Sequence, residues 1–368
     1  MRMTYLRRRD MFYLRHLFVT VLGLSLASAA FAEKPERPMG HEQIPGWATN
    51  TFQSLEFGVL LEVEGFASKI GGESQSDILL ATAAFDIEAS MNDWLLGHVG
   101  LLWEQYSRED DNLDEAYIAL GASESIPFYL VAGRFYQPVG NFESVFISDP
   151  LTLELAEMNQ VSAMVGYENP WLDLNAGAFQ GDVKEGVAAG DGGDSTIDDF
   201  YASLSLAPVE QIKLGVYWLS DLMETYNLSR VGEEIANLAG YEKSGGAGAF
   251  LNLYLGIFTF NAEYVSALQS YDVAGGSYVP AAFNLEGSVQ VHEKVVVGLK
   301  FEASDDLYAT YDAGALGFGE KLPGQSYGAV AAYAFREHAT VAAEYLHAEE
   351  LDNDASGDMV TVQLSLEF

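Results

Sequence analysis

Carboxylates are the most abundant groups in this chain that could do chemistry. They are concentrated in four segments, at residues 109–114, 191–199, 305–306 and 349–354. Clustered carboxylate oxygens are the ligands that Ca²⁺ and Mg²⁺ prefer. None of the segments has the D-x-[DN]-x-[DN]-G spacing of a calcium-binding loop, so we predict no specific metal site. Solvated surface charge is the role that we expect for them.

Catalytic chemistry is not predicted either. The chain has no cysteine, which excludes thiolate nucleophiles and disulfide bonds. His98, His292, His338 and His347 have neither the serine neighbourhood nor the paired aspartate that a hydrolase would need. We therefore expect no enzymatic activity and no cofactor.

The strongest candidate for ligand contact is the segment 133–157, which contains GRFYQPVGNFES and, two residues later, ISDPLTLELAE. A guanidinium can pair with a carboxylate through two hydrogen bonds, and aromatic rings can stack on a ligand. The candidate residues are Arg134, Tyr136, Asn141, Phe142, Glu143 and Asp149. The alternative is that Pro138, Gly140 and Pro150 only mark a surface turn.

β-strands must position these side chains. The last residues, 360–368, alternate without exception between apolar and polar, which is the period of a strand with one oily and one wet face. Similar alternation recurs along the chain. It predicts sixteen strands, near 55–67, 77–90, 93–106, 113–121, 127–136, 160–167, 171–180, 198–206, 211–219, 246–256, 257–265, 280–289, 294–303, 324–334, 338–347 and 358–368.

The connections between these strands alternate between short turns and long loops. The long ones lie near 68–76, 107–112, 137–159, 181–197, 220–245, 266–279, 304–323 and 348–357. This alternation is typical of up-and-down membrane barrels, whereas sandwiches turn at regular short intervals. We predict an all-β, transmembrane antiparallel barrel of about 16 strands, with 14–18 as the range, formed by residues 51–368.

A set of glutamates falls on the polar face of these strands, which lines the lumen of a membrane barrel. The lumen carboxylates that we predict are Glu62, Glu104, Glu263, Glu302 and Glu344, together with Glu56, Glu64 and Glu286. Arg134, Lys213 and Lys300 are the few cations predicted on the same face. A lumen of this charge favours cations.

The N-terminus has the pattern of an export signal. Arginines and an apolar run at 17–26 precede an A-x-A cleavage site that ends at Ala32. We predict a signal peptide at 1–32 and a short periplasmic tail at 33–50, which has three prolines and no periodicity. The formal net charge of −36 argues against nucleic acid as a partner.

The segment 133–157 resembles the corresponding stretch of the LbtU-family siderophore porins, outer-membrane proteins implicated in ferric-siderophore uptake. The likeness in strand number, loop pattern and terminal phenylalanine extends over most of the chain, but the specific motif is confined to this segment. Val139 stands where the family has the phenylalanine of P-F-G. The resemblance implies that the segment folds into the barrel and forms the constriction or the ligand route.

Together these observations predict a multi-pass protein of the Gram-negative outer membrane that passes small solutes passively. The resemblance implies a ferric siderophore as the solute, whereas the charges favour a general cation-preferring diffusion porin. A structural or adhesive barrel is the third interpretation. Phe368 is predicted to be the signal that the barrel assembly machinery recognises. Outer-membrane lipid and lipopolysaccharide, bridged by divalent ions to the acidic loops, are the other expected partners, and a homotrimer is left open.

Overall fold

The computed structural model describes residues 53–92, 94–105, 112–123, 126–183, 196–229, 242–273, 276–305, 323–350 and 356–368. The signal peptide and the periplasmic tail predicted for residues 1–50 lie outside this part of the chain, so both stay predictions. Most of the acidic segments at 109–114, 191–199 and 349–354 also lie outside it.

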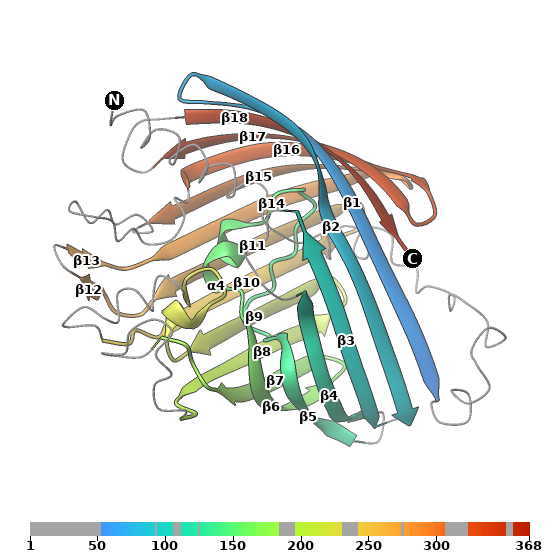
Figure 1. The fold of residues 1–368 in the computed structure, drawn as a ribbon, viewed down its shortest axis with the longest axis vertical. Coiled ribbons are helices and arrows are strands. Elements are labelled where there is room, and N and C mark those ends of the chain that lie inside the picture. Colours follow the sequence, from blue (N-terminus) through green and yellow to red (C-terminus); the bar gives the residue numbers. More distant parts are fainter. Residues whose placement is uncertain are drawn as a thin grey trace.

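Sixteen strands form one closed antiparallel barrel, in which β18 pairs with β1 to complete the ring (Figure 1). The barrel strands are β1 (Ser54–Ile70), β2 (Glu73–Asn92), β3 (Leu95–Glu104), β4 (Leu113–Ser123), β5 (Ile126–Tyr136), β6 (Asn159–Asn169), β7 (Leu172–Phe179), β8 (Asp199–Val209), β9 (Ile212–Leu219), β10 (Gly246–Leu255), β11 (Phe258–Ala267), β14 (Ala281–His292), β15 (Val295–Asp305), β16 (Pro323–Arg336), β17 (Ala339–Glu350) and β18 (Ser356–Glu367). Each coincides with a predicted strand, so the predicted fold class is confirmed.

One connection differs from its prediction. The segment 68–76 was expected to be a long loop, but β1 and β2 run on until only Gly71 and Gly72 separate them. Both glycines have positive φ angles, 57° and 88°, which a tight hairpin turn requires and which other residues rarely adopt. The polar residues on either side extend the two strands instead of forming a loop.

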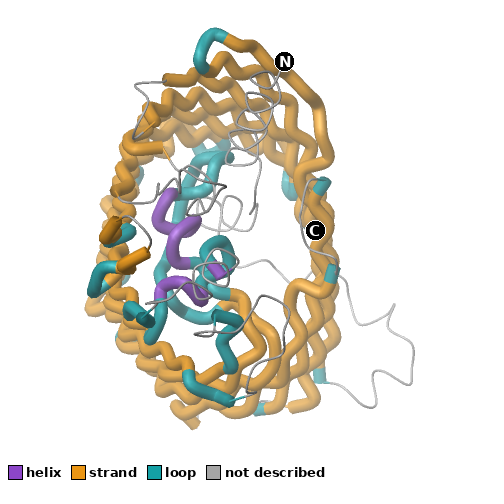
Figure 2. Tube along the Cα trace, turned by 60° about the vertical axis from the view of Figure 1, so that its left-hand side comes forward, coloured by secondary structure: helices purple, strands orange, loops and turns teal. Residues whose placement is uncertain are grey.

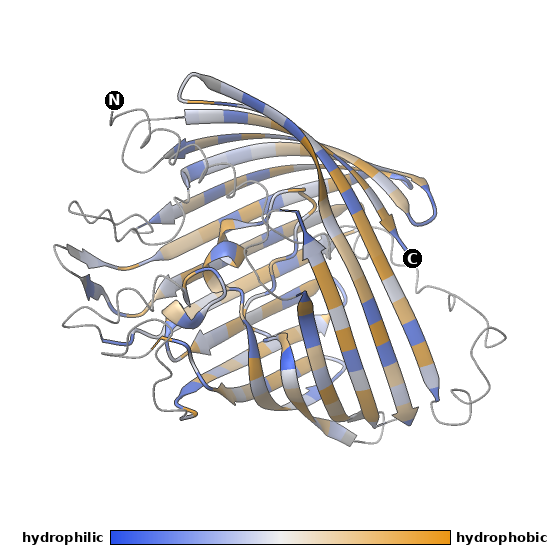
Figure 3. Ribbon diagram, in the orientation of Figure 1, coloured by the Kyte–Doolittle hydropathy of each residue, from blue (hydrophilic) through white to orange (hydrophobic). Residues whose placement is uncertain are grey.

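The two faces of the barrel differ as a membrane requires (Figure 3). On β18, Val362 is 46% exposed and points outward, whereas its neighbour Thr361 is 4% exposed and points inward. Outward apolar residues of this kind recur on every strand of the ring and form a lipid-facing belt. The described residues contain no helix long and apolar enough to cross a membrane.

Part of the barrel interior is filled by chain that leaves the wall. The connection between β5 and β6 contains a short helix, α4 (Leu151–Ala156), which lies inside the ring of strands (Figure 2). It packs against β11, β14 and β15. Two further small elements, the 3-10 helix η2 (Leu222–Glu224) and the hairpin β12 (Tyr271–Val273) with β13 (Gly276–Tyr278), belong to other loops on the same end of the barrel.

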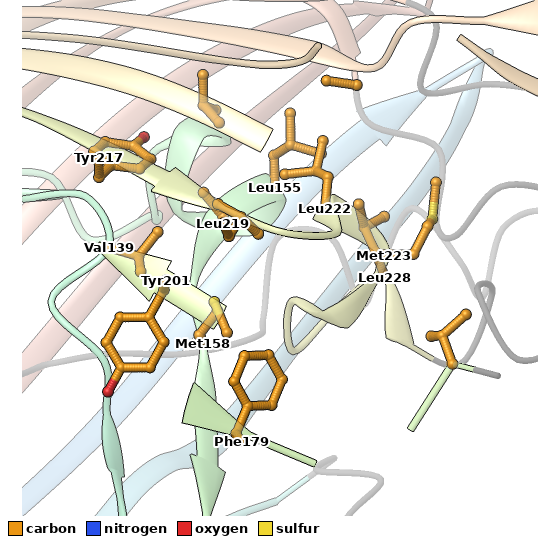
Figure 4. Close-up of a cluster of buried hydrophobic side chains, with 14 of the residues drawn as sticks. Val139, Leu155, Met158, Phe179, Tyr201, Tyr217, Leu219, Leu222, Met223 and Leu228 are labelled. Atoms are coloured by element: carbon orange, nitrogen blue, oxygen red, sulfur yellow. The ribbon is translucent and has the colours of Figure 1, made fainter. Parts of the chain in front are cut away.

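Apolar side chains of α4, of these loops and of the inner wall form one buried cluster (Figure 4). Its loop members include Leu155, Met158, Leu222 and Met223, each fully buried. They meet inward residues such as Phe179 at the ends of the barrel strands. The inner face of the wall is therefore apolar wherever the cluster covers it.

Candidate functional site

The segment 137–158, which we call the inward loop, connects β5 to β6 and crosses the barrel interior. It turns sharply at Gly140, whose φ is 91°, and at Phe142, whose φ is 47°. The phenyl ring of Phe142 lies so close to Gly140 that a Cβ there would approach it to 2.1 Å. Only glycine fits this position, and the turn directs the following residues along the wall.

Backbone amides of the inward loop bond to carboxylates on the inner wall. The N–H groups of Asn141 and Phe142 donate to the two oxygens of Glu263 on β11, at 3.1 and 2.9 Å. Ser144 Oγ and the Val145 N–H donate to Glu286 on β14, at 2.7 and 3.3 Å. Each carboxylate therefore receives two donors from consecutive loop residues.

The second half of the inward loop continues this pattern along the wall. The N–H groups of Ile147 and Ser148 donate to Glu344 on β17, at 2.6 and 3.0 Å. The Leu151 N–H, at the start of α4, donates to Glu302 on β15 at 3.0 Å. Four wall carboxylates, Glu263, Glu286, Glu302 and Glu344, thus fix the loop along its length.

Two lysines from the wall complete the attachment. Lys300 on β15 has no exposed side-chain surface; it lies 3.2 Å from Glu302 and donates to Ser148 Oγ at 2.7 Å. Lys213 on β9 is 38% exposed, bonds to Asn141 Oδ1 and lies 3.3 Å from Glu143. Glu143 also accepts from the Tyr254 hydroxyl at 2.6 Å. Both cations predicted on this wall are therefore paired with the loop or with a wall carboxylate.

This arrangement changes the role of the lumen carboxylates. Glu263, Glu302 and Glu344 were predicted to set the field of an open lumen, yet each is buried and bonded to the inward loop. A hydrogen bond to a charged group contributes about 1.5–3 kcal/mol, so four such anchors hold the loop firmly. Glu62, in contrast, is buried on β1 beside Thr82 and Ser365 and does not contact the loop.

The inward loop is also attached to the loops above it. Asn227 Nδ2 donates to the Glu154 carboxylate at 2.9 Å, and the Tyr226 N–H donates to the Glu157 carbonyl at 2.8 Å. The apolar cluster of Figure 4 adds contacts between α4 and the η2 segment. The loop is held both by the wall and by the connection between β9 and β10.

Arg134 does not face the side of the strand that was expected. In register, Arg134 stands opposite Ala116 on β4 and Val161 on β6, and Val161 is 68% exposed on the outer face. Arg134 therefore faces outward, and its Nε bonds to Asn159 at 3.3 Å. Tyr136 has the same strand parity, and its hydroxyl donates to Asp114 at 2.9 Å.

The inward orientation predicted for Arg134 was wrong for a physical reason. On β5 both faces are apolar, because Val131 and Phe135 point inward and pack into the buried cluster. Alternation therefore gives no contrast from which the inward face could be chosen.

Carboxylates gather around α4, and sequence analysis recognised only part of them. Asp149 precedes the helix, Glu154 lies on it and Glu157 follows it. Burial, and then the charges of Glu154 and its acidic neighbours, raise the pKa of Asp149 and of Glu157 well above their usual range. Glu104, at the end of β3, is among those neighbours for both groups. We call Glu104, Asp149, Glu154 and Glu157 the α4 carboxylates.

The four carboxylate anchors of the loop belong to β11, β14, β15 and β17. We call the wall made by β1, β2 and β3, which supplies none of these four, the bare wall. Its inward side chains include Asp86, Glu88 and His98. The His98 ring stacks on Tyr117 at 4.9 Å, and its Nε2 lies 3.5 Å from Asp86. Across the described part of the chain, no group of three histidine or acidic residues is arranged to hold a metal ion.

The sequence relatives are distant. No protein-family model matches the chain. It is 23% identical over 234 residues to a UPF0422 protein of Coxiella burnetii, covering 61% of this chain and 50% of that one. A UPF0422 protein of Legionella pneumophila is 23% identical over 104 residues, covering 26% of this chain and 20% of its own length. The chain thus spans half or less of the curated relatives that it matches.

Solved structures are similar over nearly the whole barrel. OmpF of Salmonella typhi, in complex with daunomycin, has a TM-score of 0.61 at 12% identity, covering 87% of this chain and 99% of that one. OprB of Pseudomonas putida has a TM-score of 0.59 at 11% identity, with coverages of 88% and 96%. The outer membrane channel DcaP of Acinetobacter baumannii has a TM-score of 0.56 at 12% identity, covering 86% and 98%. The chain has the fold of outer-membrane porins.

Proposed function

We propose that the protein is an outer-membrane channel for passive diffusion of small solutes and that it prefers cations. The porin fold supports the channel, and the lipid-facing belt supports a place in the outer membrane. The single observation that carries the preference is the state of the inward cations. Lys300 is buried against Glu302, and Lys213 is bound to Glu143 and Asn141.

The remaining inward charges of the described chain are mostly carboxylates. Asp86 and Glu88 lie on the bare wall, and Glu104 lies at the end of β3 in the same wall. Asp149, Glu154 and Glu157 belong to α4 and its flanks. A lumen of one sign concentrates counter-ions and repels ions of the same sign. Anionic solutes would therefore meet a barrier, while small cations would be concentrated in the channel.

Reversal potentials of the purified full chain in planar bilayers test this proposal. Under a tenfold KCl gradient, the potential should have the sign of potassium permeation and should shrink at high salt, because salt screens the carboxylates. A reversal potential of the opposite sign would contradict the cation preference. No conductance at all would favour the structural or adhesive barrel.

Uptake of a ferric siderophore is the second candidate. It is supported by the place of the segment that resembles the LbtU family, since residues 137–157 of it lie inside the barrel. Arg134 no longer supplies a lumen cation for an anionic ligand. Of the two inward lysines described above, Lys213 is the one with exposed side-chain surface, at 38%, and could make such contact. If Lys213→Met lowers radioiron uptake more than it changes conductance, the siderophore is the cargo; parallel changes would indicate a general channel.

A homotrimer remains a proposal for the assembly. One solved relative in fold, OmpT of Vibrio cholerae, is described in a trimer form, with a TM-score of 0.51. Chemical cross-linking of the full chain in outer-membrane vesicles would show a band at three times the monomer mass. A monomer band alone would refute it.

A further inference from the structure

His98 lies on the inner face of β3, among acidic side chains of the neighbouring strands. In register it stands opposite Glu88 on β2 and Tyr117 on β4, and Glu88 in turn stands opposite Glu56 on β1. The imidazole stacks on the Tyr117 ring, with the ring centroids 4.9 Å apart and the planes 16° from parallel. This stacking contact holds the imidazole in one plane against the wall.

A glycine makes room for two carboxylates beside the imidazole. Gly100 is the next inward residue of β3 and stands opposite Asp86 on β2 and Glu115 on β4. A Cβ on Gly100 would lie 2.8 Å from Asp86 Oδ1 and 3.3 Å from His98 Nε2, so a larger residue would push these groups apart. The Nε2 atom itself lies 3.5 Å from Asp86 Oδ1 and 3.7 Å from Glu115 Oε2. One ring nitrogen is thus within ion-pair distance of carboxylates from both neighbouring strands.

The two ring nitrogens of His98 are buried without hydrogen bonds. Among the described residues, neither Nδ1 nor Nε2 has a hydrogen-bond partner. A buried polar atom in that state is costly, so the place is not one that packing alone would give to a histidine. A proton on the ring adds a positive charge, which the carboxylates of Asp86, Glu88 and Glu115 attract.

The carboxylates around His98 are open to the lumen. The side chains of Asp86 and Glu115 are 38% and 21% exposed, while that of His98 is 12% exposed. Ions in the lumen therefore meet the net charge of this group of side chains rather than the charge of one member. A proton bound to His98 changes that net charge by one unit, and the exposed part of the ring lets it exchange the proton with the lumen.

The other described histidines are placed differently. His347 has a carboxylate partner, Asp358, at 2.9 Å, but it stands on the outer face opposite Tyr327, which is 48% exposed. His292 and His338 lie at the short turns that follow β14 and β16. Within the described part of the chain, His98 is thus the histidine that faces the lumen.

We propose that His98 is a selectivity-determining residue whose protonation lowers the channel's preference for cations. The proposal rests on the proposed cation-preferring channel and adds a regulator to it. Histidine is the side chain that ordinarily changes charge between about pH 5 and 8. With a neutral ring, the bare wall presents the full negative charge of Asp86, Glu88 and Glu115. With a protonated ring, part of that charge is offset, and anions meet a lower barrier.

Reversal potentials of the purified full chain under a tenfold KCl gradient test the proposal between about pH 8 and 5. In the wild type, the ratio of cation to anion permeability should fall about twofold or more as the pH is lowered. His98→Gln carries no charge at any pH, so its ratio should stay close to the wild-type value at about pH 8 throughout. His98→Arg keeps a planar cation that can stack on Tyr117, so its ratio should be low throughout.

The matched control is His347→Gln, which removes a carboxylate-paired histidine from the outer face and should keep the wild-type fall. A fall that persists in His98→Gln overturns the proposal, because other groups would then cause it. A wild-type ratio in His98→Arg at about pH 8, or loss of the fall in His347→Gln, overturns it as well. Heat-modifiable migration on gels shows that each variant has folded.

The failure of this proposal is distinguishable from failure of the proposed function. If the wild type prefers cations at about pH 8 and the His98 variants behave as it does at every pH, the channel stands and the regulator is refuted. If the wild type shows no cation preference at about pH 8, the proposed function is refuted, and this proposal with it.

Discussion

The barrel carries inward carboxylates on two walls, but only those on one wall bind the inward loop. On the wall from β9 to β17, which we call the loop-bearing wall, Glu263, Glu286, Glu302 and Glu344 are used up in holding the inward loop. On the bare wall, Asp86 and Glu88 have no loop to hold. The charge of an inward residue therefore does not tell whether it acts on solutes. What decides is whether backbone amides reach it.

The anchors on the loop-bearing wall also keep the inward loop in a fixed position inside the barrel. A loop inside a barrel must satisfy its backbone N–H groups, since unpaired buried amides are costly. Here carboxylates on several strands take them in sequence order, from Asn141 to Leu151. The loop is thereby spread along one wall, and the anchors do not come from the opposite wall.

The largest effect is expected from removing anchors on the loop-bearing wall. Glu263→Ala with Glu344→Ala takes away the acceptors of four loop amides. At about 1.5–3 kcal/mol for each charged hydrogen bond, the loop should leave the wall. Single-channel conductance should then change severalfold and become noisier.

The matched variant on the bare wall is Glu88→Ala, which should leave the conductance within about a factor of two, because it alters only local charge. Equal conductance changes in the two variants would show that the anchors do not position the loop.

A smaller effect on stability is expected from Lys300→Met. Lys300 is fully buried between Glu302, Ser148 and the Phe146 ring. Removing one partner of a buried ion pair costs about 3–5 kcal/mol, since the other charge stays buried. The midpoint of unfolding in denaturant should fall for the folded barrel in detergent.

Lys213→Met is the control for this variant, because Lys213 is partly exposed and its ion pair is screened by solvent. Its loss should cost under about 1 kcal/mol. If both variants unfold at the same denaturant concentration, Lys300 does not stabilise the loop-bearing wall.

Most of the fold could be predicted from the sequence because lipid imposes one rule on every strand. The outer face must be apolar along the whole ring, so strands such as β10 and β11 could be separated at Gly256 even inside a nearly continuous apolar run. The prediction of a long loop at 68–76 was wrong, because two glycines can form the turn while the polar residues around them continue the strands. Length of a polar stretch is thus a poor guide to loop length.

The site was harder to predict, because its contacts join distant parts of the chain. The Asn141 and Ile147 amides bond to residues 122 and 197 positions away, and no local pattern marks such pairs. A signal existed for the inner faces: where they become apolar, as at Phe135, a loop must cover them. The same signal would have warned that alternation cannot place Arg134.

The effect that is most limited in extent is expected in the loops above the loop-bearing wall, where Glu224 is fully buried. Its carboxylate accepts from the Asp182 and Val183 N–H groups at 2.8 and 3.0 Å. Burial, and then the charge of Asp199, raise the pKa of Glu224 from its ordinary value of 4.5 to about 8.

The sign of the pH dependence follows from this shift. Between about pH 8 and 4.5 the folded loops hold a proton that the opened loops release, so lowering the pH favours the folded loops. The protection of the η2 amides of Leu222 and Met223 from hydrogen exchange, corrected for the intrinsic rate, should rise as the pH is lowered from about 8 to 4.5. The rise should be up to about tenfold per pH unit. In Glu224→Gln the same amides should show no such rise, because the titrating group is gone. If protection in the wild-type chain instead decreases as the pH is lowered, Glu224 is ionised in the folded loops and Asp199 does not act on it.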